Sequence, residues 1–157
     1  MEIVDSLPEV RTVLVPVGGG GLVAGIGTAV KGLVPRAQVF GVQAEGAAPL
    51  PRALQTRQSH RIDRPQTIAD GIGIGIILPS MAEVLGRVLD GALLVADAEI
   101  RMAMRRLALE AKIVAEPAGA AAFAAWIRYR DALRPPVAAV VSGGNVDPNL
   151  LADVTKG

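Results

Sequence analysis

The sequence predicts an α/β fold in which helices flank a parallel β-sheet. A continuously apolar run before Gly18, in a predicted strand at residues 12–17, and a second predicted buried strand at 38–43 enclose a segment of helical spacing at residues 21–33. Uninterrupted apolar strands are typical of a sheet that is covered on both faces. A strand–helix–strand unit of this length is typical of a crossover between parallel strands. We therefore expect residues 1–157 to form a single domain with a parallel sheet.

The segments around this unit continue the alternation. Residues 2–10 are predicted to be the end of a helix, since its apolar side chains share one face and Pro8 closes it. A short helix interrupted by prolines is expected at 47–57. Residues 59–66 are polar and basic, which predicts a solvated loop, and His60 is expected to face solvent there.

The middle of the chain predicts a helix at 79–89, a strand at 92–95 and a long helix at 97–113. Asp97 is the expected N-cap of the long helix, because its carboxylate can accept backbone N–H bonds. Apolar residues recur along one face of that helix. Its other face carries charged side chains that we expect to be solvated, namely Arg101, Arg105, Arg106 and Glu110.

The last third predicts a helix at 117–130, a buried strand at 137–141 and a short helix from Pro148. Pro117 suits the first position of its helix, which puts Glu116 at the cap position. Two interpretations of Glu116 stay open: its carboxylate caps its own helix, or it faces a ligand.

Composition excludes several classes of function. The formal net charge is +1, which argues against an electrostatic nucleic-acid binder. No cysteine is present, so disulfides and thiolate chemistry are excluded. No basic, apolar leader opens the sequence, and no apolar run reaches the roughly 20 residues of a membrane span. We therefore expect a soluble, cytoplasmic protein without membrane contacts. The mean hydropathy of +0.42 also indicates an apolar face that another chain or another part of the same polypeptide covers.

Two glycine-rich segments follow predicted strands. Gly18, Gly19, Gly20 and Gly21 separate the strand at 12–17 from its helix, which leaves several amides bare at the positive end of a helix dipole. A phosphate is the ligand that such a turn favours. Ser142–Asn145 follows the strand at 137–141, and ligands of parallel sheets lie at the carboxyl ends of strands. The alternating Gly/Ile segment 71–76 is interpreted either as a close backbone approach or as a buried irregular connection.

These motifs resemble the second half of the catalytic domain of threonine dehydratases and serine racemases, which are pyridoxal 5'-phosphate enzymes of the tryptophan-synthase-β fold type. The resemblance covers nearly the whole chain. It is carried by six motifs in the family's order, at residues 16–22, 41–46, 67–71, 97–100, 116–120 and 142–147.

The resemblance implies a role for each site residue. The backbone of Gly18–Gly21 and Leu22 would hold the cofactor phosphate. Ser142, with Gly143 beside it, would hydrogen-bond the pyridine nitrogen. Gly71 would lie beside the cofactor ring through its main chain, and Glu116 would lie near the ring and the substrate. Serine or threonine would be the substrate, and the complete enzyme would be a homo-oligomer.

Two departures from the family pattern accompany the resemblance. In the family, the lysine that binds the cofactor covalently belongs to the first half of the domain, and neither Lys31, Lys112 nor Lys156 has that context. No catalytic residue is therefore assigned to this chain. The family's divalent-metal site uses carboxylates where this chain has Gln43 and Pro49, so no metal is expected.

Three hypotheses of function follow. The first is a serine/threonine ammonia-lyase of which this chain is a fragment, with the N-terminal half of the domain missing. The second is a Rossmann-type dinucleotide binder, because residues 19–24 satisfy G-x-G-x-x-A and Glu45 follows the second strand. The third is a non-catalytic half-domain, either a remnant or one that docks onto a separately encoded first half.

Overall fold

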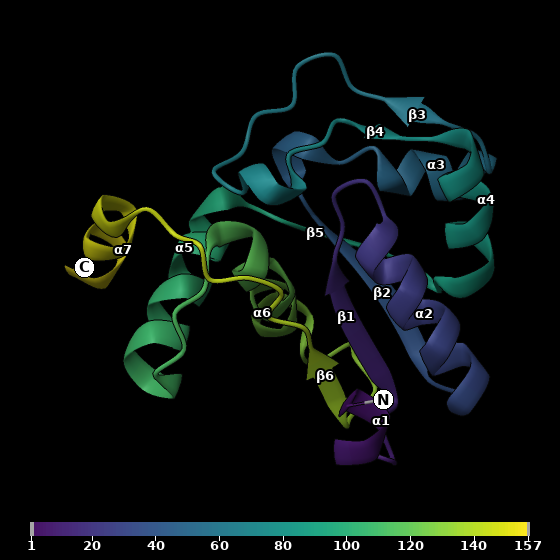
Figure 1. The fold of residues 1–157 in the computed structure, drawn as a ribbon, viewed down its shortest axis with the longest axis horizontal. Helices are drawn as coiled ribbons and strands as arrows, with labels where there is room; N and C mark the ends of the chain where they lie inside the picture. The colour runs from purple at the N-terminus through teal and green to yellow at the C-terminus, as the bar shows by residue number, and fades with distance from the viewer. Residues whose placement is uncertain (1, 157) are drawn as a thin grey trace.

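A four-stranded parallel sheet forms the centre of the protein, whose residues 2–156 are described by a computed structural model (Figure 1). All neighbouring strands in this sheet are parallel, with the order β5-β2-β1-β6. The strands are β1 (Thr12–Pro16), β2 (Gln38–Ala44), β5 (Gly91–Val95) and β6 (Val137–Ala139). The predicted α/β class with a parallel sheet is confirmed, whereas the assignment of 1–157 to one domain stays a prediction.

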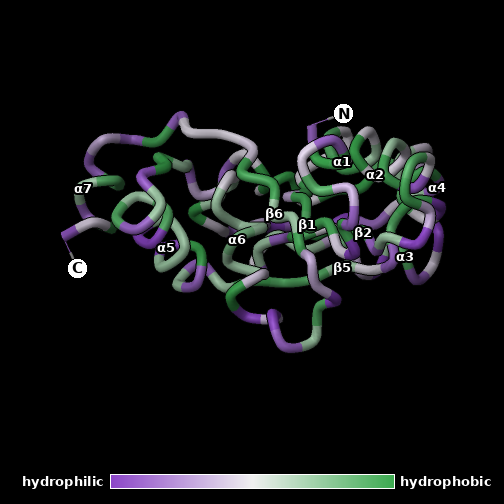
Figure 2. Tube along the Cα trace, turned by 90° about the horizontal axis from the view of Figure 1, so that it is seen from below, coloured by the Kyte–Doolittle hydropathy of each residue, from purple (hydrophilic) through white to green (hydrophobic). Residues whose placement is uncertain are grey.

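Helices cover both faces of the sheet (Figures 1 and 2). One face packs against α2 (Gly21–Leu33), α3 (Leu50–Thr56) and α4 (Pro79–Val88), and the other against α5 (Asp97–Arg106) and α6 (Pro117–Tyr129). In β1, Val13 and Val15 pack on the face covered by α2, α3 and α4, and Leu14 packs on the face covered by α5 and α6. Successive side chains of a strand point to opposite faces, and both faces of β1 are covered, which explains why its residues are apolar apart from Thr12.

Small side chains let α6 lie close to the sheet. Almost the whole first half of this helix is buried, including Ala118, Ala120, Ala121 and Ala122. The larger Phe123 and Trp126 stack on each other at the helix surface, with ring centroids 5.4 Å apart. The alanine-rich sequence therefore supplies close packing rather than side-chain volume.

The predicted loop at 59–66 is partly wrong. His60–Arg61 forms β3, which pairs antiparallel with β4 (Ile76–Ile77) as a separate two-stranded sheet. His60 is half-buried there rather than solvent-facing. The preceding helix is also shorter than predicted, because a 3₁₀ turn (Glu45–Ala47) comes first and α3 begins only at Leu50.

The long helix predicted at 97–113 differs at both ends. Its N-cap is Ala96, whose backbone N–H donates to the Glu99 carboxylate at 2.7 Å. The Asp97 carboxylate instead accepts from the Thr67 hydroxyl at 2.6 Å and from the Ile68 amide at 3.0 Å. The regular helix ends at Arg106 and continues as a π-helical segment, Leu107–Ala111. Asp97 therefore anchors a distant loop, because its side chain reaches across to residues 67–68.

The charged face of α5 is only partly solvated. Arg105 donates to the carbonyls of Val154 and Thr155, and Arg101 forms an ion pair with Asp153 at 3.0 Å. These three acceptors belong to the C-terminal helix α7 (Pro148–Lys156), which lies beside α5 (Figure 1). The prediction of a solvated face is wrong for Arg105, which α7 partly buries, whereas the Arg101 side chain stays 41% exposed.

Strand β6 ends at Ala139, and its residues are half-buried rather than buried as predicted. The reason is its place at the end of the strand order, where it pairs only with β1 among the described strands. The N-terminal helix α1 (Glu2–Ser6) lies near its start (Figure 1). Among residues 2–156, none of the helices has the length and apolar character needed to cross a bilayer.

Candidate functional site

The turn after β1 presents free backbone amides. Its conformation depends on Gly20, which has a φ of 102° in the left-handed region that favours glycine. No side chain caps α2, and within residues 2–156 the amides of Gly19, Gly20 and Gly21 donate to no backbone acceptor. The helix that follows has 13 residues, so its dipole adds partial positive charge at this end. The turn is therefore suited to an anion.

A second wall comes from the segment after β6 and the start of α6. The Glu116 amide donates to the Gly143 carbonyl at 3.0 Å. A Cβ added to Gly143 would lie 2.5 Å from Glu116 Oε1, and one added to Gly119 would overlap the Gly143 main chain. This hydrogen bond and the close backbone approach place Ser142 beside the N-terminus of α6.

A third wall is the 3₁₀ turn Asp70–Ile72. A Cβ on Gly18 would lie 3.0 Å from the Gly71 carbonyl oxygen, and a Cβ on Gly71 would lie 3.6 Å from Glu116 Oε1. The Gly71 main chain thus lies between the glycine turn and Glu116. Of the two interpretations of this segment, the close backbone approach is the one that the structure supports.

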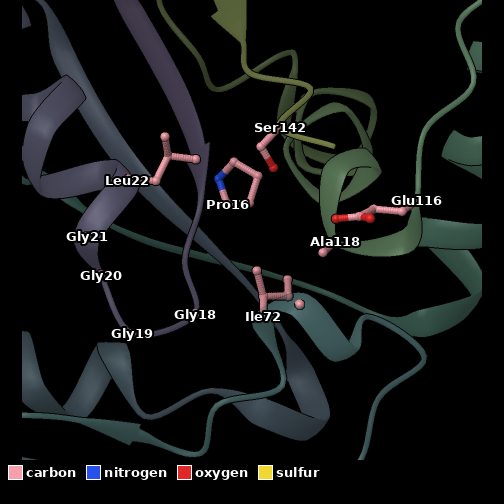
Figure 3. A pocket seen from close by; sticks show the side chains of 11 residues that line it. Pro16, Gly18, Gly19, Gly20, Gly21, Leu22, Ile72, Glu116, Ala118 and Ser142 are labelled. Carbon is pink, nitrogen blue, oxygen red and sulfur yellow. The ribbon is translucent and has the colours of Figure 1, made fainter. Parts of the chain in front are cut away.

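The three walls enclose one cavity of about 250 Å³ at the carboxyl ends of the strands (Figure 3). It is lined by Pro16, Gly18, Gly19, Gly20, Gly21, Leu22, Gly71, Ile72, Glu116, Ala118 and Ser142. The predicted cofactor residues are brought together here, except that Gly143 lies behind Glu116 and does not line the cavity.

Three lining residues were missed by sequence reasoning: Pro16, Ile72 and Ala118. Each lies within two residues of a predicted site residue. Extending the predicted site by two residues on either side of the glycine turn, Gly71 and Glu116 would have included all three. Pro16 and Ala118 belong to the motifs at 16–22 and 116–120 but were given no role, and Ile72 lies one residue beyond the motif at 67–71.

Glu116 is the charged side chain of the lining. It occupies the N-cap position of α6, yet its side chain makes no capping hydrogen bond. Figure 3 shows its carboxylate pointing into the cavity opposite the glycine turn, with the Ser142 hydroxyl between them. The interpretation of Glu116 as a cap of its own helix is therefore wrong, and the interpretation that it faces a ligand fits the geometry.

No lysine lines this cavity. Lys31 donates to the Ala37 carbonyl at 2.9 Å and pairs with Asp90 at 2.7 Å, below the amino ends of the strands. Lys112 donates to the Leu109 carbonyl at 2.7 Å and is exposed at the end of the π-helical segment. Both ammonium groups are therefore held away from the glycine turn.

Gln43 occupies the position where the resemblance implies a metal ligand in the family, but here its side chain makes structural hydrogen bonds. Its side chain is fully buried, donates to the Val17 carbonyl at 3.1 Å and accepts from the Leu50 amide at 2.8 Å. It thereby ties the glycine turn to the start of α3. Over residues 2–156, no group of three or more histidine or acidic side chains could hold a metal ion.

Glu45, the acidic residue that a dinucleotide site would use, is occupied by an ion pair. Its carboxylate accepts from Arg128 at 2.8 Å, and Arg128 also pairs with Glu99 at 3.0 Å. The hydrogen bond to Glu45 is the main cause that raises the pKa of the Arg128 guanidinium. This pairing argues against the Rossmann-type alternative, because a ribose would have to displace a charged partner.

The fold and the cavity define a parallel α/β protein with a turn suited to an anion at the carboxyl ends of its strands. A family model described as "Pyridoxal-phosphate dependent enzyme" matches residues 1–143. The chain belongs to this family, whose cofactor is pyridoxal phosphate, and the resemblance drawn from the motifs is confirmed.

The relatives and solved structures that this chain resembles include threonine ammonia-lyases and serine racemases. L-threonine ammonia-lyase of Thermotoga maritima is 38% identical over 96% of this chain, and the match covers 38% of that protein. Threonine deaminase isoform 2 from Solanum lycopersicum superposes with a TM-score of 0.89 at 30% identity, over 99% of this chain and 46% of its own. Maize serine racemase has a TM-score of 0.89 at 27% identity, over 99% of this chain and 49% of its own. The chain therefore spans at most about half the length of these proteins.

Proposed function

We propose that this chain is the C-terminal half of the catalytic domain of a pyridoxal-phosphate-dependent serine/threonine ammonia-lyase. The complete enzyme would convert a hydroxy amino acid to a 2-oxo acid and ammonia. The observation that carries the proposal is the convergence of free glycine-turn amides, the Ser142 hydroxyl and the Glu116 carboxylate on one cavity. A cytoplasmic location and assembly of the complete enzyme into a homo-oligomer are part of the same proposal.

The proposed roles follow the chemistry of each wall. The amides of Gly18–Gly21 and Leu22 would bind the phosphate, as the dipole and the bare backbone favour. Pyridoxal phosphate, when bound, supplies an electron sink for negative charge that develops on the substrate α-carbon. The Ser142 hydroxyl, unlike a carboxylate, would leave the pyridine nitrogen uncharged, and this milder sink suits elimination.

The remaining residues would shape the space beside the ring. Gly71 presents main chain rather than a side chain, so a flat ring could lie against it. Ile72 and Ala118 exclude water from the same wall. Glu116 would lie on the substrate side as the charged group of the lining, where it could hold a proton near the reacting atoms.

Binding of the cofactor without a covalent bond is the first test. We expect the chain to bind pyridoxal phosphate reversibly, and borohydride reduction followed by peptide mass spectrometry to find no stoichiometric adduct on Lys31, Lys112 or Lys156. The reason is that no lysine lines the cavity. Ser142→Ala should alter the absorption of the bound cofactor while leaving its phosphate contacts intact.

The proposed cofactor roles fail if binding is insensitive to both Ser142→Ala and changes in the glycine turn. A single, stoichiometrically reduced lysine would contradict the fragment interpretation instead. These two results are distinct, since the first tests the residues of the cavity and the second tests whether this chain carries the lysine that binds the cofactor.

The open edge of the sheet supports a missing N-terminal half as partner. Strand β6 pairs only with β1 among the described strands, and its other edge is free to accept a strand. Beside this edge lies a groove of about 440 Å³, which is apolar except for one carboxylate at its rim and is lined by Glu2, Ile3, Leu22, Ile26, Ala138, Ala139 and Val140. Leu22 lines both this groove and the cofactor cavity, so a partner docked here would reach the site. The relatives are more than twice as long as this chain, and we propose that the N-terminal half of their catalytic domain occupies this groove.

Complementation tests this part of the proposal. We expect this chain, co-expressed with the N-terminal half of Thermotoga maritima L-threonine ammonia-lyase, to co-purify with it in equal amounts and to release ammonia from threonine. Ile26→Lys should abolish co-purification because it puts a charge in the groove, whereas Met102→Lys, on α5 and 46% exposed, should not. Separate elution of the two halves, with each variant still folded by circular dichroism, would refute the docking.

A further inference from the structure

A second cavity lies at the opposite end of the sheet from the cofactor cavity. It has a volume of about 430 Å³ and is lined by Pro8, Glu9, Val10, Arg11, Val34, Arg36, Ala37 and Arg134. Three of these residues are arginines from three separate segments. Arg11 directly precedes β1, Arg36 lies in the turn between α2 and β2, and Arg134 precedes the approach to β6.

The three arginines are carried on backbone that is held in place. The Arg11 amide donates to the Pro136 carbonyl at 3.0 Å, and the Arg11 carbonyl accepts from the Gln38 amide at 2.8 Å. The Thr12 hydroxyl donates to the Arg134 carbonyl at 2.9 Å. Since β2, β1 and β6 are neighbours in the sheet, their amino ends bring the three side chains to one place.

These guanidinium groups have no ion-pair or hydrogen-bond partner within residues 2–156, unlike the arginines of α4 and α5. Arg87 pairs with Glu83, Arg101 with Asp153, and Arg106 with Glu110. In the cavity the one carboxylate is Glu9, so three positive charges face one negative charge, a net of +2. Arg11, Arg36 and Arg134 are exposed, so water screens their mutual repulsion, but an anion shared among them would meet a net positive potential.

The chemistry of the lining points to one class of anion. A phosphate monoester carries close to two negative charges at neutral pH and presents three acceptor oxygens, one for each guanidinium. Guanidinium groups present their N–H donors to such oxygens in a fixed, planar arrangement. Val10 and Ala37 are buried and form an apolar floor that suits the carbon substituent of an ester.

We propose that Arg11, Arg36 and Arg134 form a binding site for the phosphate group of a small phosphate monoester, separate from the cofactor cavity. The separation is the length of β1, a five-residue strand that spans on the order of 15 Å. Binding at each cavity can therefore be followed through different backbone amides. The proposal does not depend on the identity of the ligand in the glycine turn.

Inorganic phosphate is the probe that tests the site. In ¹⁵N–¹H spectra of the 157-residue chain, we expect saturable shifts of the amides of Arg11, Ala37 and Arg134 as phosphate is added at constant ionic strength. Arg11→Gln combined with Arg36→Gln and Arg134→Gln should weaken this binding at least about tenfold. The control Arg52→Gln with Arg64→Gln, at two exposed arginines outside the cavity, should leave it unchanged.

Glu9→Gln gives a test of opposite sign. Removing the one carboxylate of the lining should tighten phosphate binding several-fold, which general destabilisation of the fold would not do. Shifts that grow linearly without saturation, that appear equally with sodium chloride, or that persist in the triple arginine variant would overturn the proposal. Shifts confined to the glycine turn would also overturn it, while leaving the cofactor site intact.

Discussion

Replacing Gly119 by alanine is expected to destabilise the fold by about 1–3 kcal/mol, the range for overpacking. The added Cβ would overlap the backbone of Gly143, and backbone atoms cannot give way as the end of a flexible side chain can. The segment carrying Ser142 would have to leave the N-terminus of α6, and the 3.0 Å hydrogen bond from the Glu116 amide to the Gly143 carbonyl would break. The cofactor cavity would then lose its second wall.

Urea unfolding followed by circular dichroism measures this change in the free energy of unfolding. The matched control is Gly32→Ala in α2, where no atom lies within 4 Å of the added Cβ. There we expect a gain of up to about 1 kcal/mol, because alanine favours the helix over glycine. Equal stability of the Gly119→Ala variant and the parent chain would show that the close approach to Gly143 has no energetic consequence.

Replacing Gly20 by alanine is expected to weaken binding of the cofactor phosphate by about tenfold or more. The φ of 102° at Gly20 puts an L-residue in a strained region, at a cost of about 1–2 kcal/mol. Its Cβ would also lie 2.6 Å from Met81 Cγ. Relief of this strain would rotate the turn and disperse the free amides, which converge only while residue 20 keeps its left-handed conformation.

Calorimetric titration with pyridoxal phosphate measures the loss, and Gly25→Ala is the control. Gly25 lies one turn further along α2 with no atom within 4 Å of an added Cβ, so binding should be unchanged. Adding Met81→Ala to Gly20→Ala separates the two causes. If backbone strain dominates, the double variant stays weak, whereas recovery of full affinity would assign the effect to the clash with Met81.

Local pattern was enough to predict the four strands of the parallel sheet, the main helices and the glycine turn, but not the β3–β4 pair. The apolar run at β1 could belong only to a strand covered on both faces, and Val13, Leu14 and Val15 are indeed divided between two cores. The glycine turn was found because several consecutive glycines exceed what a plain turn needs. Both signals depend on neighbours in the chain, which a sequence displays directly.

Side chains that act over a long distance were predicted poorly. Asp97 had the local signature of an N-cap, but it binds Thr67 and Ile68, 29 or 30 residues away in the chain. Arg105 had the signature of a solvated helix face, but α7 covers it. For Glu116 the sequence left two roles open, and the choice between them depended on what lies opposite its carboxylate.

By itself, the sequence determined the parallel α/β architecture, the place of the glycine turn and the family to which the chain belongs, because each can be read from local periodicity or from contiguous motifs. Only the tertiary structure decided that Gly18, Gly71, Glu116 and Ser142 share one cavity, and that three distant arginines share another. The physical reason is that strand order and crossover geometry bring residues together that are far apart in the chain. The spacing of residues along the sequence does not reveal that order.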